Sequence, residues 1–266
     1  MSKEKIRDYY NKNAEYEWKR LIQDNYHRLE FDTTMHFIKR YIKTEKLILD
    51  AGGGPGRYTI ELAKLGHELV LFDLTPKLLD IAKQRIINEK LENNISEIMQ
   101  GSFTDLSIYE NNHFDAVICL GAALNHVLSK KERKKAISEL IRVTKSQGLL
   151  FVSVISKLAV LIDPFLRQNQ DMNLFKKALE SGDYKGGAFA PSHFYTVDEF
   201  KEEFSCKKID LLQLVGLEGL ASLKNHRVNK WNKEIYNDWW KIHLKTCTHP
   251  AVAETSSHFL GIFKKK

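Results

Sequence analysis

An acidic residue followed by closely spaced glycines is the feature of this sequence with the clearest chemical meaning. Within residues 50–56 these positions are Asp50, Gly52, Gly54 and Gly56. The apolar run 47–49 precedes them and an amphipathic segment follows at 57–65, which predicts a strand, a tight loop and a helix. α/β proteins use this connection to hold a nucleotide-like ligand at the carboxyl end of a strand. The chemistry of this protein therefore depends on which ligand the loop accepts.

Two common ligands of such loops do not suit these residues. A Walker phosphate loop needs a lysine directly after its last glycine, and this position is occupied by Arg57. The dinucleotide fingerprint G-x-G-x-x-G could begin at Gly52 and Gly54, but its third glycine, which allows close contact between helix and strand, would also fall on Arg57. The loop is instead D-x-G-x-G-x-G.

A second acid, Asp73, ends the next apolar run at 68–73. The glycine loop together with Asp50 and Asp73 resembles class I S-adenosylmethionine-dependent methyltransferases. The resemblance implies that S-adenosylmethionine is the cofactor and that its methionyl part lies against the glycine backbone, where a Cβ atom would not fit. It also implies that Asp73 accepts hydrogen bonds from both ribose hydroxyls.

Further segments extend this resemblance. Gly101-Ser102-Phe103 falls where the family surrounds the adenine, although the family commonly has an aspartate where this chain has Ser102. Residues 114–122 look like the family's fourth-strand motif, and 140–150 like the helix, turn and fifth strand that follow it. In small-molecule members an N-terminal tyrosine and arginine close over the cofactor and its carboxylate. The implied cofactor-binding residues are Tyr10, Arg20, Asp50, Gly52, Gly54, Gly56, Asp73, Leu74, Gly101, Ser102, Phe103, Leu120 and Gly121.

Methyl transfer to nitrogen or oxygen also requires that the acceptor lose a proton, which calls for a base within reach. Holding nucleophile, methyl and sulfur in line can by itself lower the barrier by about 7–11 kcal/mol. We expect the base at His126, which follows the fourth strand, or at His193, with Tyr195 beside it. Packing without a chemical role is the alternative for each histidine.

The elements that position these residues alternate between strand and helix through residue 155, which predicts a parallel sheet with helices on both faces. The expected strands are 47–50, 68–73, 95–99, 114–120, 149–155, 209–215 and 257–263. The resemblance implies a doubly wound, Rossmann-like α/β fold with seven strands. In that fold the last strand is antiparallel and lies between the fifth and the sixth.

Segments outside this alternation define the expected domain organisation. We expect an N-terminal helical lid at 1–46, a cofactor-binding core at 47–155 and a helical insertion at 156–195, with helices at 158–166 and 172–179. Residues 196–266 complete the sheet and contain a second helical insertion at 217–248. In that insertion one helical stripe, expected to be core or a partner contact, consists of Trp231, Ile235, Trp239 and Ile242.

Composition limits the classes of protein to which the chain can belong. The formal charge of +7 is dispersed, which favours a solvated surface over a nucleic-acid footprint without excluding one. Three scattered cysteines lack metal-binding spacing, so no metal site is expected. No apolar run could span a bilayer, and the first residues lack the apolar core of a signal peptide, so we expect a cytoplasmic protein, a monomer or a homodimer.

Taken together, these patterns predict methyl transfer from S-adenosylmethionine to a nucleophile of a small molecule or short peptide. Two alternatives stay open at this point. The same fold could methylate RNA or protein, with residues 221–248 as the basic contact. The chain could also bind the cofactor as a regulatory protein without turnover. The acceptor, the acceptor atom and the use of a base are not determined by the sequence.

Overall fold

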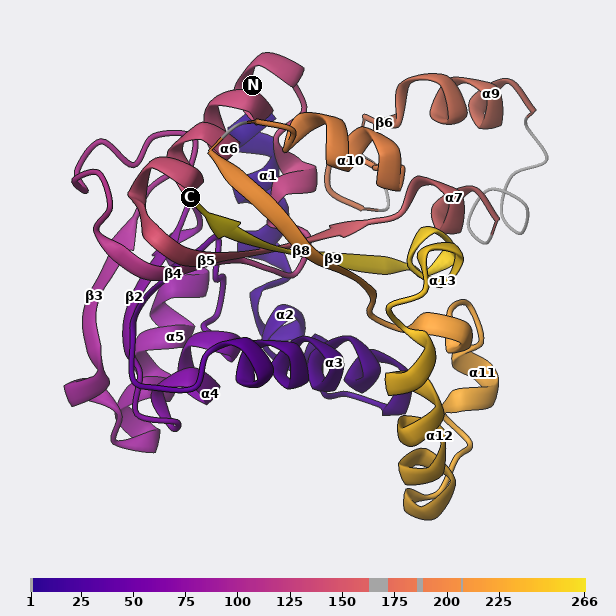
Figure 1. Ribbon diagram of the computed structural model, residues 1–266, viewed down its shortest axis with the longest axis horizontal. Helices are drawn as coiled ribbons and strands as arrows, with labels where there is room; N and C mark the ends of the chain where they lie inside the picture. The colour runs from indigo at the N-terminus through magenta and orange to yellow at the C-terminus, as the bar shows by residue number, and fades with distance from the viewer. Residues whose placement is uncertain (1, 163–171, 186–188, 207) are drawn as a thin grey trace.

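The computed structural model describes residues 2–162, 172–185, 189–206 and 208–266, and its centre is a seven-stranded sheet (Figure 1). The strands are β1 (Leu47–Ala51), β2 (Glu68–Asp73), β3 (Ile95–Gln100), β4 (Phe114–Cys119), β5 (Thr144–Ile155), β8 (Ile209–Gly216) and β9 (His258–Lys265). Their order is β3-β2-β1-β4-β5-β9-β8, and β9 runs antiparallel to both of its neighbours. This confirms the predicted seven-stranded α/β fold and the place of its last strand.

Helices cover both faces of the sheet because successive strand residues point to opposite sides. On one face, Leu49 and Ala51 of β1 pack into a core with α6 (Lys130–Val143) and α10 (Val197–Glu203). On the other face, Ile48 packs into a core with α3 (Asn25–Tyr41) and α4 (Arg57–Ala63). On this second side α5 (Pro76–Glu89) packs against α4 and β2. Two buried cores therefore hold the carboxyl ends of β1, β2 and β4 rigidly at one edge.

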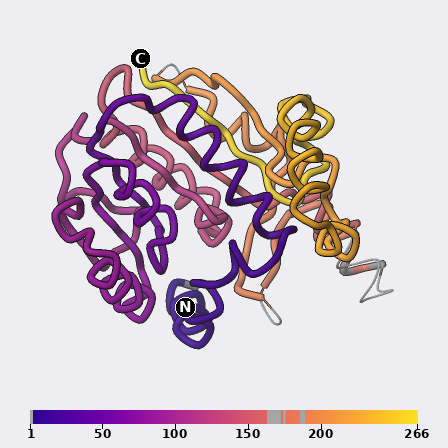
Figure 2. Tube along the Cα trace, turned by 90° about the horizontal axis from the view of Figure 1, so that it is seen from below, coloured from indigo at the N-terminus to yellow at the C-terminus, as the bar shows by residue number. Residues whose placement is uncertain are grey.

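Three helices precede the sheet, as expected for residues 1–46. The first two are α1 (Ser2–Lys12) and α2 (Ala14–Arg20), which both contact α5, and α3 then crosses the sheet (Figure 2). The guanidinium of Arg57 lies 3.5 Å from the ring centre of Trp18 and donates a hydrogen bond of 2.6 Å to the Trp18 carbonyl. This contact holds α2 against the start of α4, beside the glycine loop. A lid function for these helices stays a prediction.

The first insertion contains the expected helices and, in addition, a small sheet that was not predicted from the sequence. Its helices are α7 (Lys157–Val160) and α9 (Met172–Ser181), and its two-stranded sheet pairs β6 (Asp183–Tyr184) with β7 (Ser192–His193). The helix predicted at 172–179 is confirmed. The helix predicted at 158–166 starts as expected, but its last residues, 163–166, lie outside the described part of the chain.

The second insertion places the helix α12 (Lys233–Thr246) and the short helix α11 (Asn225–Val228) beside the start of α3. Of the predicted stripe, Trp231 and Trp239 pack against the buried side chains of Leu29, Ala221 and Val228. Ile235 and Ile242 are about half exposed and so do not belong to the core, and a partner contact at these two residues stays a prediction. Trp231 precedes the helix and so does not share its phase. The face of α12 turned to the protein consists instead of Tyr236, Trp239, Trp240 and His243.

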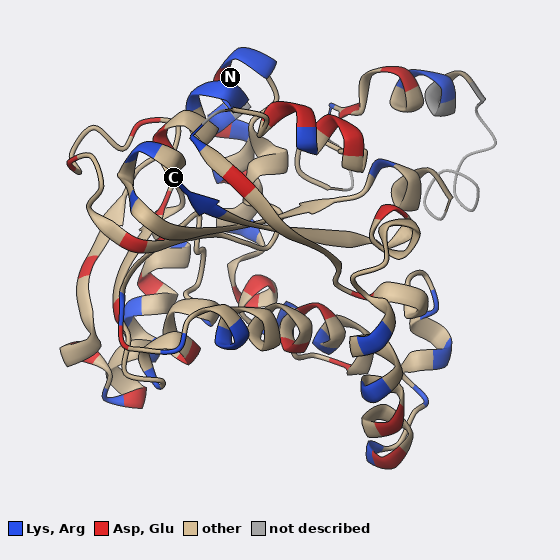
Figure 3. Ribbon diagram, in the orientation of Figure 1, with Lys and Arg blue, Asp and Glu red and all other residues tan. Residues whose placement is uncertain are grey.

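Charged side chains of both signs alternate along most surface helices, including α12 (Figure 3). No helix in the described ranges is long and apolar enough to cross a membrane. The dispersed charge agrees with the solvated surface that the sequence predicts.

Candidate functional site

A pocket opens at the carboxyl ends of β1, β2 and β4, and we call it the glycine-loop pocket. Every residue predicted to bind the cofactor lines it except Gly56, and so does the predicted base His126. The lining includes Tyr10, Arg20, Asp50, Gly52, Gly54, Asp73, Leu74, Gly101, Ser102, Phe103, Leu120, Gly121 and His126. The fold thus brings residues from five separate stretches of the chain to one cavity.

The loop needs glycine for two different reasons. Gly52 and Gly54 have φ angles of +80° and +54°, a left-handed conformation that L side chains rarely adopt. A Cβ atom at Gly52 would also lie 2.7 Å from the Cβ of Ala123. Gly56 is the N-cap of α4, and its missing Cβ leaves room for Ala82 of α5 at 3.1 Å. Gly56 also has a left-handed φ of +77°, and it lies against α5 and not in the pocket wall, so its predicted role in cofactor binding stays a prediction.

The carboxylate of Asp73 lies beside the loop and is already partly engaged. Its two oxygens accept hydrogen bonds from the backbone N–H groups of Gly54, at 2.9 Å, and Thr75, at 2.7 Å. Burial raises the pKa of this carboxyl, and these backbone donors partly offset that rise. Each carboxylate oxygen has a second lone pair, so Asp73 can accept further hydrogen bonds from a ligand.

Asp50 is fully buried under the same loop. One carboxylate oxygen accepts a hydrogen bond of 2.6 Å from the hydroxyl of Thr59, and the other has no partner among the described residues. Burial raises the pKa of Asp50 to about 7. A Cβ atom on Gly53 would lie 2.5 Å from this carboxylate, so the acid and the loop backbone are in close contact.

At the far wall of the pocket, the hydroxyls of Ser102 and Thr104 are 2.9 Å apart, and Lys3 donates a hydrogen bond of 2.9 Å to Thr104. Phe103 lies against Gly52, since a Cβ there would be 3.3 Å from its ring. Lys3 and Thr104 were not predicted. No local pattern marks Lys3, because only tertiary folding brings α1 to this loop.

His126 lines the pocket, but its imidazole is occupied on both sides. Its Nδ1 lies 2.9 Å from the carbonyl oxygen of Pro191, which can only accept, so Nδ1 carries the proton. Its Nε2 therefore accepts the hydrogen bond from the hydroxyl of Tyr10, at 2.6 Å. Burial lowers the pKa of His126 to about 4, so the ring is neutral at pH 7. Tyr10 therefore occupies the ring nitrogen through which His126 would accept a proton.

His193 and Tyr195 do not line the glycine-loop pocket. The two ring nitrogens of His193 contact carboxylate oxygens of Asp183, at 2.7 Å, and Glu199, at 2.9 Å. Tyr195 is fully buried and donates to Glu203 at 3.2 Å. The backbone of this stretch does lie beside the site, because the carbonyl oxygen of His193 accepts a hydrogen bond of 2.7 Å from Asn125. The backbone of Tyr195 bonds to residues 155–157, and neither the His193 nor the Tyr195 side chain lines the pocket, so their role as a base stays a prediction.

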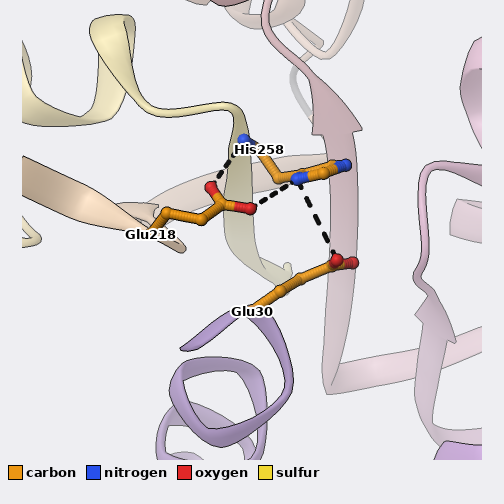
Figure 4. A group of neighbouring side chains, drawn as sticks. All are labelled: Glu30, Glu218 and His258. Carbon is orange, nitrogen blue, oxygen red and sulfur yellow. Dashed lines mark hydrogen bonds and ion pairs between the residues drawn. The ribbon is translucent and has the colours of Figure 1, made fainter. Parts of the chain in front are cut away.

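A second cavity, which we call the insertion pocket, adjoins the first. Its walls come from α2, α3 and the two insertions, and it shares Tyr10, Glu17, Arg20 and Gly121 with the glycine-loop pocket. Buried at its side, the carboxylates of Glu30 and Glu218 surround the imidazole of His258 (Figure 4). Sequence reasoning missed this cluster, because its members are far apart in the chain and lie in no shared motif.

Arg20 lines both pockets and forms ion pairs with acidic residues of their walls. Its Nε donates to Glu17 at 3.2 Å and its Nη1 to Glu30 at 2.8 Å, while Nη2 lies nearest to Gly121 at the shared wall. These carboxylates raise the pKa of Arg20, although burial opposes them. Both salt bridges of Arg20 are thus largely buried.

Comparisons with known proteins agree on one kind of domain. Residues 48–148 match the family model described as "Methyltransferase domain". The glycine/sarcosine N-methyltransferase of Parasynechococcus marenigrum (strain WH8102) is 29% identical over 136 residues, which are 51% of this chain and 46% of that protein. The ubiquinone/menaquinone biosynthesis C-methyltransferase of Zymomonas mobilis is 30% identical over 127 residues, 47% of this chain and 48% of that one. The chain spans about half the length of the curated relatives it matches.

Solved structures share the fold over nearly the whole chain. An S-adenosylmethionine-dependent methyltransferase from Clostridium acetobutylicum aligns with a TM-score of 0.61 at 14% identity, covering 96% of this chain and 98% of that one. A protein of the same description from Methanosarcina mazei aligns with a TM-score of 0.58 at 20% identity, covering 86% and 96%. At these identities the likeness concerns the fold alone.

Proposed function

We propose that this protein is an enzyme that methylates a small molecule, because residues 48–148 match the family model described as "Methyltransferase domain" and the glycine-loop motifs resemble class I S-adenosylmethionine-dependent methyltransferases. The family match confirms the family that the glycine loop and its companion motifs predict, and this family implies S-adenosylmethionine as the methyl donor. The activity of the whole chain is our proposal. It is supported by relatives that carry the names of small-molecule methyltransferases.

The observation that carries the proposal is the glycine-loop pocket with Asp73 at its side. Left-handed glycines line it without Cβ atoms, and the Asp73 carboxylate keeps lone pairs free beside them. These residues fit the donor. Asp73 would accept from its ribose hydroxyls, and the backbone at Gly52 and Gly54 would lie against its methionyl part. When bound, the donor supplies a methyl group on a positively charged sulfur, which a nucleophile can displace.

Two further contacts complete the proposed donor site. Ser102 and Phe103 would flank the adenine, the first by its hydroxyl and the second by its ring. Arg20 has Nε and Nη1 committed to carboxylates, so Nη2 at the shared wall is the nitrogen available for the donor's carboxylate. Because Arg20 is held on both sides, this nitrogen is positioned before any ligand arrives.

We propose that catalysis depends chiefly on alignment, with Tyr10 as the residue that faces the reacting groups. Tyr10 lines both pockets, and its hydroxyl is fixed by its hydrogen bond to the Nε2 of His126. A histidine whose pKa is near 4 is a weak base at neutral pH, so His126 is proposed as a positioning residue for Tyr10. The acceptor would enter from the insertion pocket, which meets the donor site at this tyrosine.

Incubation with methyl-labelled S-adenosylmethionine and a cell extract tests the proposal. Label in the small-molecule fraction supports it. Label in RNA or protein would favour a polymer methyltransferase, and donor binding without any labelled product would favour a regulatory protein. Calorimetry of donor binding alone accompanies the assay, because absent binding refutes the proposed site directly.

A further inference from the structure

We propose that the insertion pocket recognises a methyl acceptor that carries a protonated amine, and that Glu30 receives this amine. The inference rests on the proposed function, since it names the class of acceptor for that same site. It is carried by one buried carboxylate oxygen that has no hydrogen-bond partner among the described residues, together with the charges around it.

Glu30 is the residue with unused hydrogen-bonding capacity. It lies on α3, is 1% exposed and lines the insertion pocket. Its Oε2 accepts from Nη1 of Arg20 at 2.8 Å, whereas its Oε1 is buried and has no hydrogen-bond partner within the described residues. A buried carboxylate oxygen without a donor is costly, because ions and polar groups lose their hydration on burial. A ligand that donates to Oε1 would remove that cost.

The neighbouring acid, Glu218, is less available than Glu30, because both of its oxygens already accept hydrogen bonds. Oε2 of Glu218 accepts from the hydroxyl of Ser256, at 3.0 Å, and from the backbone N–H of His258, at 2.8 Å. Its Oε1 accepts from Nδ1 of His258 at 2.6 Å (Figure 4). Glu30 Oε1 is therefore the open acceptor of this cluster.

The charges around that oxygen favour a cation. Three carboxylates, those of Glu17, Glu30 and Glu218, face two cations, Arg20 and the protonated His258. The acids Glu30 and Glu218 raise the pKa of His258 to about 9, against the opposing effect of burial, so its ring is charged at neutral pH. Within this group of five side chains one negative charge remains unbalanced when all three acids are ionised. The exposed part of the lining adds two lysines, Lys177 and Lys185, and two acids, Glu180 and Asp183, which leaves that balance unchanged. An ammonium group supplies both the missing charge and the missing donor.

An organic ammonium fits the cluster better than a divalent metal ion does. A metal would need the Nδ1 lone pair of His258, but Nδ1 donates to Glu218 and the ring holds its proton firmly. The rest of the pocket suits the carbon body of an amine, because aromatic rings line it and attract cations through their faces. These rings belong to Tyr10, Tyr26, Tyr184, Phe189 and Phe194.

The position of Glu30 also indicates that the ammonium group which it binds is not the atom that becomes methylated. Glu30, Glu218 and His258 line the insertion pocket but not the glycine-loop pocket, whereas Tyr10 and Arg20 line both. A protonated amine has no lone pair and cannot attack a methyl group. The ammonium held at Glu30 is therefore an anchor, and another atom of the acceptor, nearer to the shared wall, receives the methyl group.

The test compares benzylammonium with benzyl alcohol, which has nearly the same shape and no charge, by NMR titration of the full chain at pH 7. We expect benzylammonium to bind at least tenfold more tightly. The substitution Glu30→Gln should remove this preference and leave the affinity for benzyl alcohol unchanged. Glu180→Gln is the matched control, because Glu180 lines the same pocket but is exposed, and it should change neither affinity.

Equal affinity of the wild-type protein for the two probes overturns the inference without any variant. So does displacement of benzylammonium by an equimolar amount of Mg²⁺ or Zn²⁺, which would assign the cluster to a metal. In the labelling assay, the methylated product should be retained by a cation exchanger at pH 7, and a product that flows through contradicts the inference. Donor binding measured by calorimetry separates the two levels. If the donor binds without a preference for ammonium, this inference alone fails, whereas an ammonium preference without donor binding refutes the proposed function.

Discussion

The most informative single change is Asp73→Asn, because it removes the charge from the proposed ribose acceptor while keeping its shape. Asp73 accepts from the backbone N–H groups of Gly54 and Thr75 and has one remaining lone pair on each oxygen. The amide of asparagine keeps one accepting oxygen and replaces the other by a donor. That donor faces either a backbone N–H or a ribose hydroxyl, so at least one hydrogen bond to a charged acceptor is lost.

Loss of one hydrogen bond to a charged group costs about 1.5–3 kcal/mol. With 1.4 kcal/mol for each factor of ten, the affinity for S-adenosylmethionine should fall roughly 10- to 150-fold. Asp73→Ala should weaken binding by at least the same amount, and it also leaves two N–H groups of the loop without their acceptor. We therefore expect a lower melting temperature for the alanine variant than for the asparagine variant.

Isothermal titration calorimetry with S-adenosylmethionine measures the effect, and thermal unfolding checks that the variant is folded. Asp80→Asn serves as the control, since Asp80 is an exposed acid on the following helix and lines neither pocket. A folded Asp73→Asn protein with unchanged affinity would refute the placement of the ribose beside Asp73. An equal loss in the Asp80 control would show that the effect is general and unrelated to this contact.

Three further predictions follow from the same geometry. Gly54→Val should abolish donor binding but leave a folded chain, since a side chain at φ +54° costs about 1–2 kcal/mol and would face the pocket; calorimetry and circular dichroism check this. His126→Asn should lower kcat with near-normal donor affinity. The change of kcat/KM between pH 5.5 and 6.5 should be the same in the wild type and the variant, because His126, with a pKa of about 4, does not titrate there, whereas Asp50, with a pKa of about 7, does so in both. A step near pH 6.5 that only the wild type shows would restore His126 as a base of ordinary pKa. His258, with its pKa raised to about 9, stabilises the fold fully below pH 6.5, and this stability, roughly 3 kcal/mol at most, is lost as the pH rises through 9. Urea unfolding at pH 6 and pH 9.5 should therefore show a larger loss for the wild type than for His258→Gln, and equal losses would contradict the ion pair with Glu218.

The fold followed from local patterns to an unusual extent. Strand and helix alternate in the core, each strand is a short apolar run, and the connections leave little freedom in their order. The pocket-lining positions of Gly52, Gly54 and Asp73 followed for the same reason, since parallel strands bring their carboxyl ends to one edge. Gly56 shares the left-handed conformation of this loop, but its contact with Ala82 could not be predicted, because it depends on how two helices pack.

The segments outside the alternation were predicted less well, and the reason is physical. The predicted stripe combined Trp231 with Ile235 and Ile242, but Trp231 lies before the first residue of α12. It therefore does not share the helical spacing of the two isoleucines. A periodic pattern identifies a helix but not its first residue. The direction of the chain after β5 was also not visible, since it depends on backbone hydrogen bonds between residues 155–157 and Tyr195.

The sequence by itself thus determined the kind of cofactor pocket, because glycine conformations and strand ends are properties of short segments. Only the tertiary structure decided which ionisable groups are available to a substrate. His126 is covered by Tyr10, His193 lies between two carboxylates, and Glu30 retains an open oxygen. Each of these states depends on hydrogen-bond partners and burial supplied by residues from distant parts of the chain. These partners and this burial determine the charge and availability of a side chain, and they cannot be predicted from the spacing of residues within a motif.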